Sequence, residues 1–63
     1  MERFLSKKQV KELVGFSPAH IDRMEFDAEY AHLGFPRRIK IGFRVFWVAS
    51  EIDAWIAERI ATR

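Results

Sequence analysis

A run of positively charged side chains in the second half of the sequence is the first feature with chemical consequences. Between positions 37 and 44 the chain carries four cations and no acid, namely Arg37, Arg38, Lys40 and Arg44. Such a cluster can bind a polyanion, because each cation can neutralise a phosphate and release its counterion. Charge also protects the edge of a solvated strand from aggregation, but four cations exceed what edge protection requires. We therefore interpret this segment as phosphate-binding.

The net charge of +2 hides a strong separation of charge along the chain. Residues 31–49 carry +4 and residues 21–30 carry −3, while residues 1–20 carry +2 and residues 50–63 carry −1. Segregated positive charge attracts nucleic acid even when the total charge is small. The distribution therefore favours a polyanionic partner.

A second group of residues surrounds the start of a predicted helix and comprises Ser17, Ala19, His20 and Arg23. Ser17 is first a helix cap, and backbone amides at a helix start can also donate to a phosphate. Arg23 can bind guanine through two hydrogen bonds or pair with Asp27 one turn later. His20 can hydrogen-bond to a base edge or a phosphate, or it can be an ordinary exposed side chain. We expect Ala19, His20 and Arg23 to form an exposed reading face.

The composition argues against catalysis. A chain of 63 residues is too short for a deep cleft, and without cysteine it has neither disulfides nor cysteine-ligated zinc. The two histidines are twelve residues apart, and Ser6, Ser17 and Ser50 are all explained as helix caps. We therefore expect no enzyme, no cofactor and no metal. No apolar run is long enough for a membrane span or a signal peptide, so we expect a soluble, cytoplasmic protein.

Two capping signals close together predict a helix-turn-helix in the first half of the chain. The first helix starts after Ser6, where Gln9 completes a capping box, and it closes at Gly15. The second helix starts after Ser17, with Pro18 at the first helical position, where its missing N–H costs nothing. Two short helices joined by three residues that include a glycine are typical of this motif.

The acidic segment that follows gives a weaker signal. Residues 26–34 can extend the second helix or form a loop with a helical turn, and both readings stay open. Gly34-Phe35-Pro36 is expected to end either the extended helix or the helical turn. The role of the segment from Glu25 to Leu33 also stays open.

Apolar residues alternate with cations in the basic segment, which predicts a β-hairpin around Gly42. A two-residue loop, Gly42-Phe43, would pair Ile41 with Arg44 and mix charge into the apolar face. A three-residue loop that includes Arg44 would instead pair Ile41 with Val45. We favour the longer loop, which places Arg44 at the tip. Phe43 has no core to join at this turn, so it can contact the minor groove, a protein partner or a second copy.

The last helix is predicted to start at Ser50, with Glu51 and Asp53 complementing the helix dipole. One apolar stripe then runs through Ile52, Trp55, Ile56 and Ile60. The predicted fold class is mainly α with a small β-hairpin, a compact winged helix-turn-helix that occupies residues 1–63 as one domain.

The chain resembles the AlpA family of prophage regulators over nearly its whole length. The resemblance is carried by Arg3-Phe4-Leu5, Val10, Leu13-Val14-Gly15-Phe16-Ser17, Ile21, Arg23, the pattern FP..IKIG.R from Phe35 to Arg44, Trp47 and the run SEIDAWI from Ser50 to Ile56. Members are winged helix-turn-helix proteins related to phage excisionases and to MerR-type DNA-binding domains. They act as transcriptional activators or as factors that promote excision of integrated elements. The resemblance implies a reading helix beginning at Ser17 and a wing from Arg37 to Trp47.

This chain departs from the family pattern at two positions and in one segment. Pro18 replaces a basic or polar residue, and Asp22 replaces an aromatic one. Both changes lower the affinity for phosphate, although Asp22 can also accept from a cytosine amino group. The chain is also longer than the common pattern between Met24 and Phe35, which can reposition the wing or offer a site for a protein partner.

The leading hypothesis is sequence-specific binding of double-stranded DNA by a regulator or excisionase-type directionality factor of a prophage or mobile element. Integrase and RNA polymerase, or another regulator, are the expected protein partners, and self-association is expected at repeated sites. The alternative is a protein-interaction module that binds a regulator or integrase through Tyr30, Phe43 and the acidic segment without reading DNA.

Overall fold

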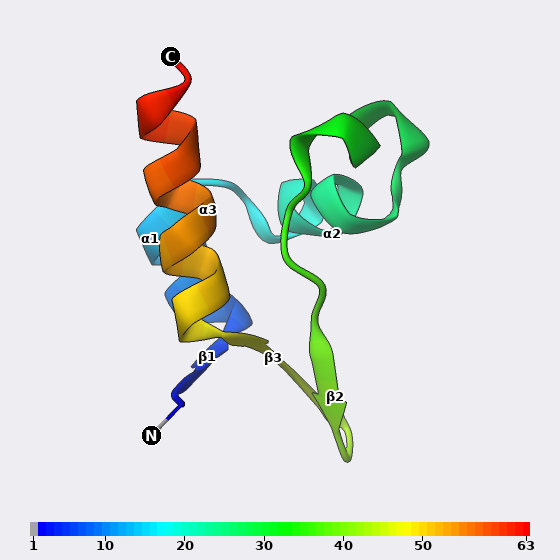
Figure 1. Ribbon diagram of the computed structural model, residues 1–63. Helices are drawn as coiled ribbons and strands as arrows, with labels where there is room; N and C mark the ends of the chain where they lie inside the picture. The colour runs from blue at the N-terminus through cyan, green and yellow to red at the C-terminus, as the bar shows by residue number, and fades with distance from the viewer. Residues whose placement is uncertain (1) are drawn as a thin grey trace.

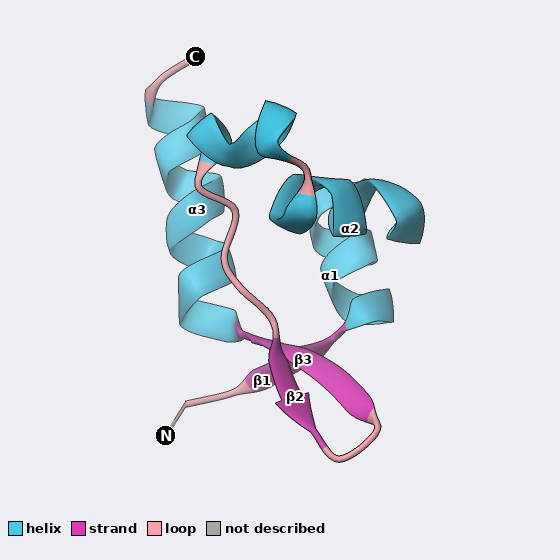
Figure 2. Cartoon of the chain, turned by 90° about the vertical axis from the view of Figure 1, so that its right-hand side faces the viewer, coloured by secondary structure: helices cyan, strands magenta, loops and turns pink. Residues whose placement is uncertain are grey.

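The structure is a computed structural model that describes residues 2–63. Its elements, in chain order, are β1 (Phe4–Ser6), α1 (Lys7–Val14), α2 (Pro18–Phe26), the 3-10 helix η1 (Ala28–Leu33), β2 (Ile39–Ile41), β3 (Arg44–Val48) and α3 (Ala49–Ala61). The helices lie together above a small antiparallel sheet, and the β2–β3 hairpin projects from them (Figures 1 and 2). This arrangement confirms the predicted fold class, a mainly α protein with a winged helix-like fold.

The predicted caps of the first two helices are confirmed. The Ser6 hydroxyl accepts from the Gln9 amide at 3.2 Å, and the Gln9 side-chain oxygen accepts from the Ser6 amide at 2.8 Å. Gly15 closes α1 with a φ of 77°, in the left-handed region that favours glycine. The Ser17 hydroxyl accepts from the His20 amide at 3.2 Å and so caps α2. These short-range bonds fix the helix-turn-helix.

The acidic segment after α2 forms a loop with a helical turn instead of a longer helix. Asp27 ends α2, and its carboxylate accepts from the Glu29 amide at 3.1 Å, which starts η1. The indole N–H of Trp55 donates to the Leu33 carbonyl oxygen at 2.8 Å, which ties the end of η1 to α3. Of the two readings left open for residues 26–34, the structure selects the second.

Strand β1 is an element that the sequence analysis did not predict. It pairs antiparallel with β3, with Phe4 opposite Val48 and Leu5 opposite Trp47, so β3 is the central strand of the order β1-β3-β2. Three residues give too short a run for an alternating pattern to be recognised. The strand is defined by its partner, whose paired residues lie 40 to 44 positions further along the chain.

The predicted three-residue hairpin loop is wrong. Ile41 pairs with Arg44, so the loop is the two residues Gly42-Phe43. Gly42 has a φ of 62°, and glycine at the first position of a two-residue loop matches the twist of the flanking strands. The prediction assumed that Ile41 must face a core, but this side chain is 48% exposed because the hairpin projects beyond the helices. Phe43, and not Arg44, therefore lies at the tip.

The predicted cap of the last helix is also wrong. β3 runs directly into α3, Val48 is the N-terminal boundary residue, and Ser50 lies inside the first turn. The Ala49 amide donates to the Arg3 carbonyl oxygen at 2.8 Å, and the Ser50 amide donates to the Glu2 carboxylate at 3.4 Å. Residues 2 and 3, next to β1, therefore accept from the first two amides of α3, which begins one residue before Ser50.

The apolar core lies where the three α-helices meet the sheet. Its buried members are Leu5, Val10, Ile21, Met24, Phe35, Trp47 and Ile52. Trp47, on the central strand, is the largest fully buried side chain. Among residues 2–63, no helix is long and apolar enough to span a bilayer.

Burial on α3 gives a stability prediction with a matched control. Ile52 is fully buried, whereas Ile60 on the same helix is 56% exposed. We expect Ile52→Val to lower the free energy of unfolding by about 1 kcal/mol, because it removes a methyl group from a packed core. Ile60→Val makes the same change at an exposed site and should leave it nearly unchanged. Urea denaturation followed by circular dichroism measures both, and equal losses would contradict this account of the core.

Candidate nucleic-acid interface

Three cations of the basic segment lie exposed on one projecting part of the molecule. We call residues 37–48 the wing; it comprises β2, the Gly42-Phe43 turn, β3 and the residues that lead into β2. Arg37, Lys40 and Arg44 are exposed, and the ion pairs found among residues 2–63 involve none of them. The Arg44 guanidinium lies 5.5 Å from the centre of the Phe46 ring. These three charges are available to a phosphate backbone.

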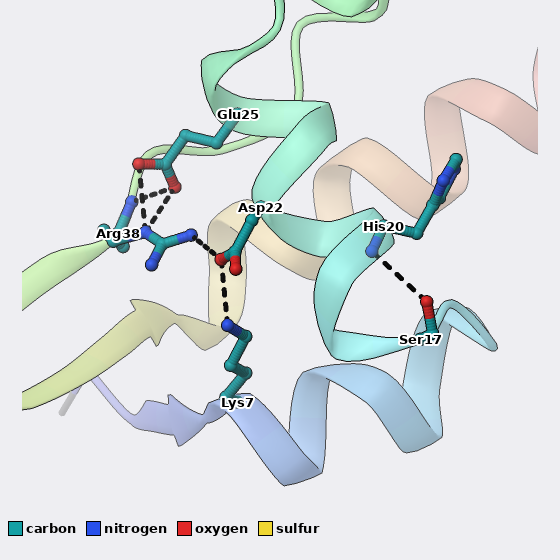
Figure 3. A network of polar contacts seen from close by, with 6 residues as sticks. All are labelled: Lys7, Ser17, His20, Asp22, Glu25 and Arg38. Carbon is teal, nitrogen blue, oxygen red and sulfur yellow. Dashed lines mark hydrogen bonds and ion pairs between the residues drawn. The ribbon is translucent and has the colours of Figure 1, made fainter.

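Arg38, the fourth predicted phosphate contact, lies in a different environment. Its Nε donates to both carboxylate oxygens of Glu25 at 3.1 Å, and its Nη2 donates to Asp22 Oδ1 at 2.7 Å (Figure 3). Its backbone amide donates to the same Glu25 carboxylate at 2.9 Å. The side chains of Arg38 and Glu25 are only 13% and 8% exposed. The structure therefore places the side chain of Arg38, at the start of the wing, against α2.

Aromatic rings complete the surroundings of the Arg38 guanidinium. Its central carbon lies 4.6 Å from the centre of the Phe26 ring and 5.1 Å from that of Trp47. A planar guanidinium suits this position because it can stack on rings while its edge donates to carboxylates. Burial by itself would lower the pKa of Arg38, but hydrogen bonds to Asp22 and Glu25 outweigh it and raise the pKa above its ordinary value. Arg38 is therefore held charged.

Lys7 extends this network to the first helix. Its ammonium donates to Asp22 Oδ1 at 2.8 Å, so one carboxylate oxygen joins α1, α2 and the start of the wing (Figure 3). The hydrogen bond from Lys7, followed by that from Arg38, lowers the pKa of Asp22 below its ordinary value. Asp22, which stands where the family pattern has an aromatic residue, thus pairs with Lys7 on one side and with Arg38 on the other.

Three of the four predicted reading-helix residues, Ser17, Ala19 and Arg23, are exposed. The Ser17 oxygen accepts from the His20 amide, so its own O–H is left to donate. The alternative pairing of Arg23 with Asp27 is not among the ion pairs of residues 2–63. Arg23 is therefore free to contact a ligand.

His20 lies differently from the expected outward position. Its ring is half-buried and packs edge-on against Phe16, with ring centres 4.6 Å apart, and against Tyr30, at 5.4 Å. It lines an apolar groove of about 490 Å³ between the helices. Other residues of this groove include Leu13, Tyr30, Leu33, Trp55 and Ile60.

The two residues predicted to contact a protein lie far from one another. Tyr30 belongs to η1, which is drawn green at the upper right of Figure 1, whereas Phe43 lies in the turn at the bottom of the same view. Figure 2 shows the same separation from a second direction. Tyr30 and Phe43 therefore lie on different parts of the molecule.

Sequence reasoning missed the positioning roles of Lys7, Asp22 and Glu25. One signal was present, because Glu25 falls on the same helical side as Ile21 and Met24, which are buried. An acid on an apolar face needs a cationic partner there. The sequence could not identify Arg38 as that partner, since the two residues are thirteen positions apart across an irregular segment.

The lowered pKa of Asp22 predicts a pH-dependent contribution to stability. The folded pKa lies below the unfolded value of about 3.9, so the stabilisation is complete above that value and is lost as the pH falls through the folded pKa. Because the side chain is 44% exposed, we expect Asp22→Asn to cost only about 1 kcal/mol or less at neutral pH. Urea titrations from pH 7 to pH 2 should show this difference vanishing in acid.

Glu12→Gln is the matched control for that series, since Glu12 is an exposed acid on α1. Its free energy of unfolding should equal that of the wild-type protein at every pH. A difference between Asp22→Asn and the wild type that stayed constant down to pH 2 would contradict the assignment of the effect to the ionised carboxylate.

Among residues 2–63, no group of three histidine, cysteine or acidic side chains is arranged to hold a metal ion.

The comparison with protein families matches residues 3–60 to the model described as prophage CP4-57 regulatory protein (AlpA). Comparisons with curated proteins and with solved structures give no match. The family match spans the helix-turn-helix, the wing and nearly all of α3. The chain therefore belongs to the AlpA family of prophage regulatory proteins.

Proposed function

We propose that this protein binds double-stranded DNA in a sequence-specific manner and regulates a prophage or another mobile element. The observation that carries the proposal is the exposure of three wing cations beside a capped helix in an AlpA family member. As a regulator of DNA it would act in the cytoplasm, either on transcription or as an excisionase-type directionality factor. Residues 1–63 would act as one DNA-binding domain.

In this proposal the phosphate contacts and the base contacts come from different elements. Arg37, Lys40 and Arg44 on the wing neutralise phosphates, and the amides at the start of α2 add a further phosphate site near Ser17. Arg23 on α2 has the two-donor fork that matches the major-groove edge of guanine. A single short helix offers few base contacts, so cooperative binding at repeated sites is expected.

The number of free wing cations predicts the salt dependence of binding. Three neutralised phosphates contribute about −2.7 to the slope of log K against log salt concentration. We expect Arg37→Gln, Lys40→Gln and Arg44→Gln together to weaken binding to all duplexes and to remove that part of the slope. Fluorescence anisotropy with a random-sequence duplex between 50 and 300 mM salt, ionic strengths at which exposed charges are screened to different extents, measures the change.

Arg63→Gln is the control for this experiment, because it removes one exposed charge at the end of α3, away from the wing (Figure 1). Its slope should match that of the wild type. An affinity that did not change in the triple variant would overturn the proposal.

Arg23→Ala is expected to relax sequence selectivity. Losing a two-donor contact with guanine should cost about 1–3 kcal/mol on the preferred duplex and much less on other sequences. Gel shifts with DNA from upstream of the protein's own gene, or from the attachment site of a neighbouring integrase, measure both affinities. An equal loss on all sequences would mean that Arg23 contacts only the backbone.

The second candidate function is binding to an integrase, RNA polymerase or another regulator without DNA recognition. The apolar groove lined by Tyr30, Leu33 and Ile60 favours it, because a concave apolar surface can receive an apolar side chain of a partner. No retardation of any duplex, combined with co-purification of an integrase or regulator, would favour this function over DNA binding.

A further inference from the structure

Phe43 is the most exposed large apolar side chain of the described residues. Its relative exposure is 108%, compared with 69% for Phe26 and 56% for Ile60. The two-residue loop places it at the tip of the hairpin, the part of the molecule that projects furthest below the helices in Figure 2. A phenyl ring held in water at the end of a rigid turn adds nothing to the core. Its position therefore points to a contact outside the molecule.

The register of the hairpin places a cation on each side of this ring. Ile41 pairs directly with Arg44, and Lys40 pairs with Val45. Directly paired residues share a face of the sheet and successive residues alternate, so Arg44 and Lys40 lie on opposite faces. A groove of duplex DNA has the complementary arrangement, since its two walls are lines of phosphates and its floor is a stack of bases. The minor groove is only about 6 Å wide, so the Phe43 ring at the tip, and not the two-stranded ribbon, is the part that would enter it.

We propose that Phe43 is a wedge that enters the minor groove and inserts between two base pairs, while Lys40 and Arg44 bind the phosphates on either side. This inference rests on the proposed function and names the residue that would deform the DNA. Apolar wedges of this kind partly unstack a base step and kink the duplex toward the major groove. The cationic neighbours fix the depth at which the ring enters.

The wedge adds a source of sequence selectivity that α2 does not supply. Pyrimidine–purine steps such as TA and CA/TG unstack most easily, so a duplex that carries one below the wing is deformed at lower cost. The protein would therefore select a flexible step at a fixed distance from the bases read by α2, without a hydrogen bond to it.

The test begins with duplexes that the wild-type protein selects from a random-sequence pool. Bound duplexes with donor and acceptor dyes at their ends report bending by energy transfer, and 2-aminopurine at the selected step reports unstacking by a rise in fluorescence. We expect Phe43→Ala to lose the bend and the rise, and to bind about tenfold more weakly. Its salt slope should not change, because no charge is removed.

Phe43→Leu is the matched variant, since it keeps an apolar wedge at the tip and should keep most of the bend. Both variants should unfold at the same urea concentration as the wild type, given the full exposure of the side chain. Duplexes selected from the random-sequence pool with the Phe43→Ala variant should no longer share a flexible step. They should still share the bases read by α2.

Each other outcome overturns the proposal in a distinct way. A Phe43→Ala variant that binds and bends DNA like the wild type removes the wedge but leaves the proposed DNA binding in place. A variant that changes sedimentation instead of bending would assign Phe43 to a contact between copies. A wild-type protein that retards no duplex overturns the proposed function and the wedge together.

Discussion

The orientation of the wing depends on one guanidinium held between two carboxylates. Arg38 bonds to Glu25 and Asp22 on α2 through its side chain and to Glu25 through its backbone amide, while its face lies against Trp47 and Phe26. A largely buried charge of this kind is costly to leave unpaired, so losing the Glu25 carboxylate, the less exposed of its two partners, costs more than losing that of Asp22. The interaction ties the start of the wing to the proposed reading helix. DNA recognition by two separate elements requires them to be held at a fixed distance and angle.

The same interaction shows which charges of the chain are paired within the molecule and which are exposed. Asp22 and Glu25, two acids of residues 21–30, pair with Lys7 and Arg38, and a third, Asp27, caps η1. Three of the four acids of residues 21–30 thus have partners within the molecule, and the basic segment presents three exposed cations rather than four. The proposed phosphate binding is thereby separated from the positioning of the wing, although both involve arginines that are neighbours in sequence.

The molecule presents its two unusual apolar features at opposite ends. Phe43 lies on the projecting turn between cations, whereas the groove beside Tyr30 lies among the helices. A ligand on the wing would leave the groove open, because the hairpin and η1 point away from one another in both views (Figures 1 and 2). This geometry is compatible with a regulator that contacts DNA and a protein at once.

The sequence by itself determined the elements whose signals are local. The caps at Ser6 and Ser17 were predictable because each involves residues three positions apart, and the sequence also located the basic segment that carries the three exposed cations. Tertiary structure decided what depends on distant partners: strand β1, the hairpin register, the start of α3 without Ser50 as its cap, and the partners of Arg38. The physical reason is that a hydrogen-bond donor can donate to any acceptor with suitable geometry. Only the folded chain determines which distant acceptor lies within bonding distance.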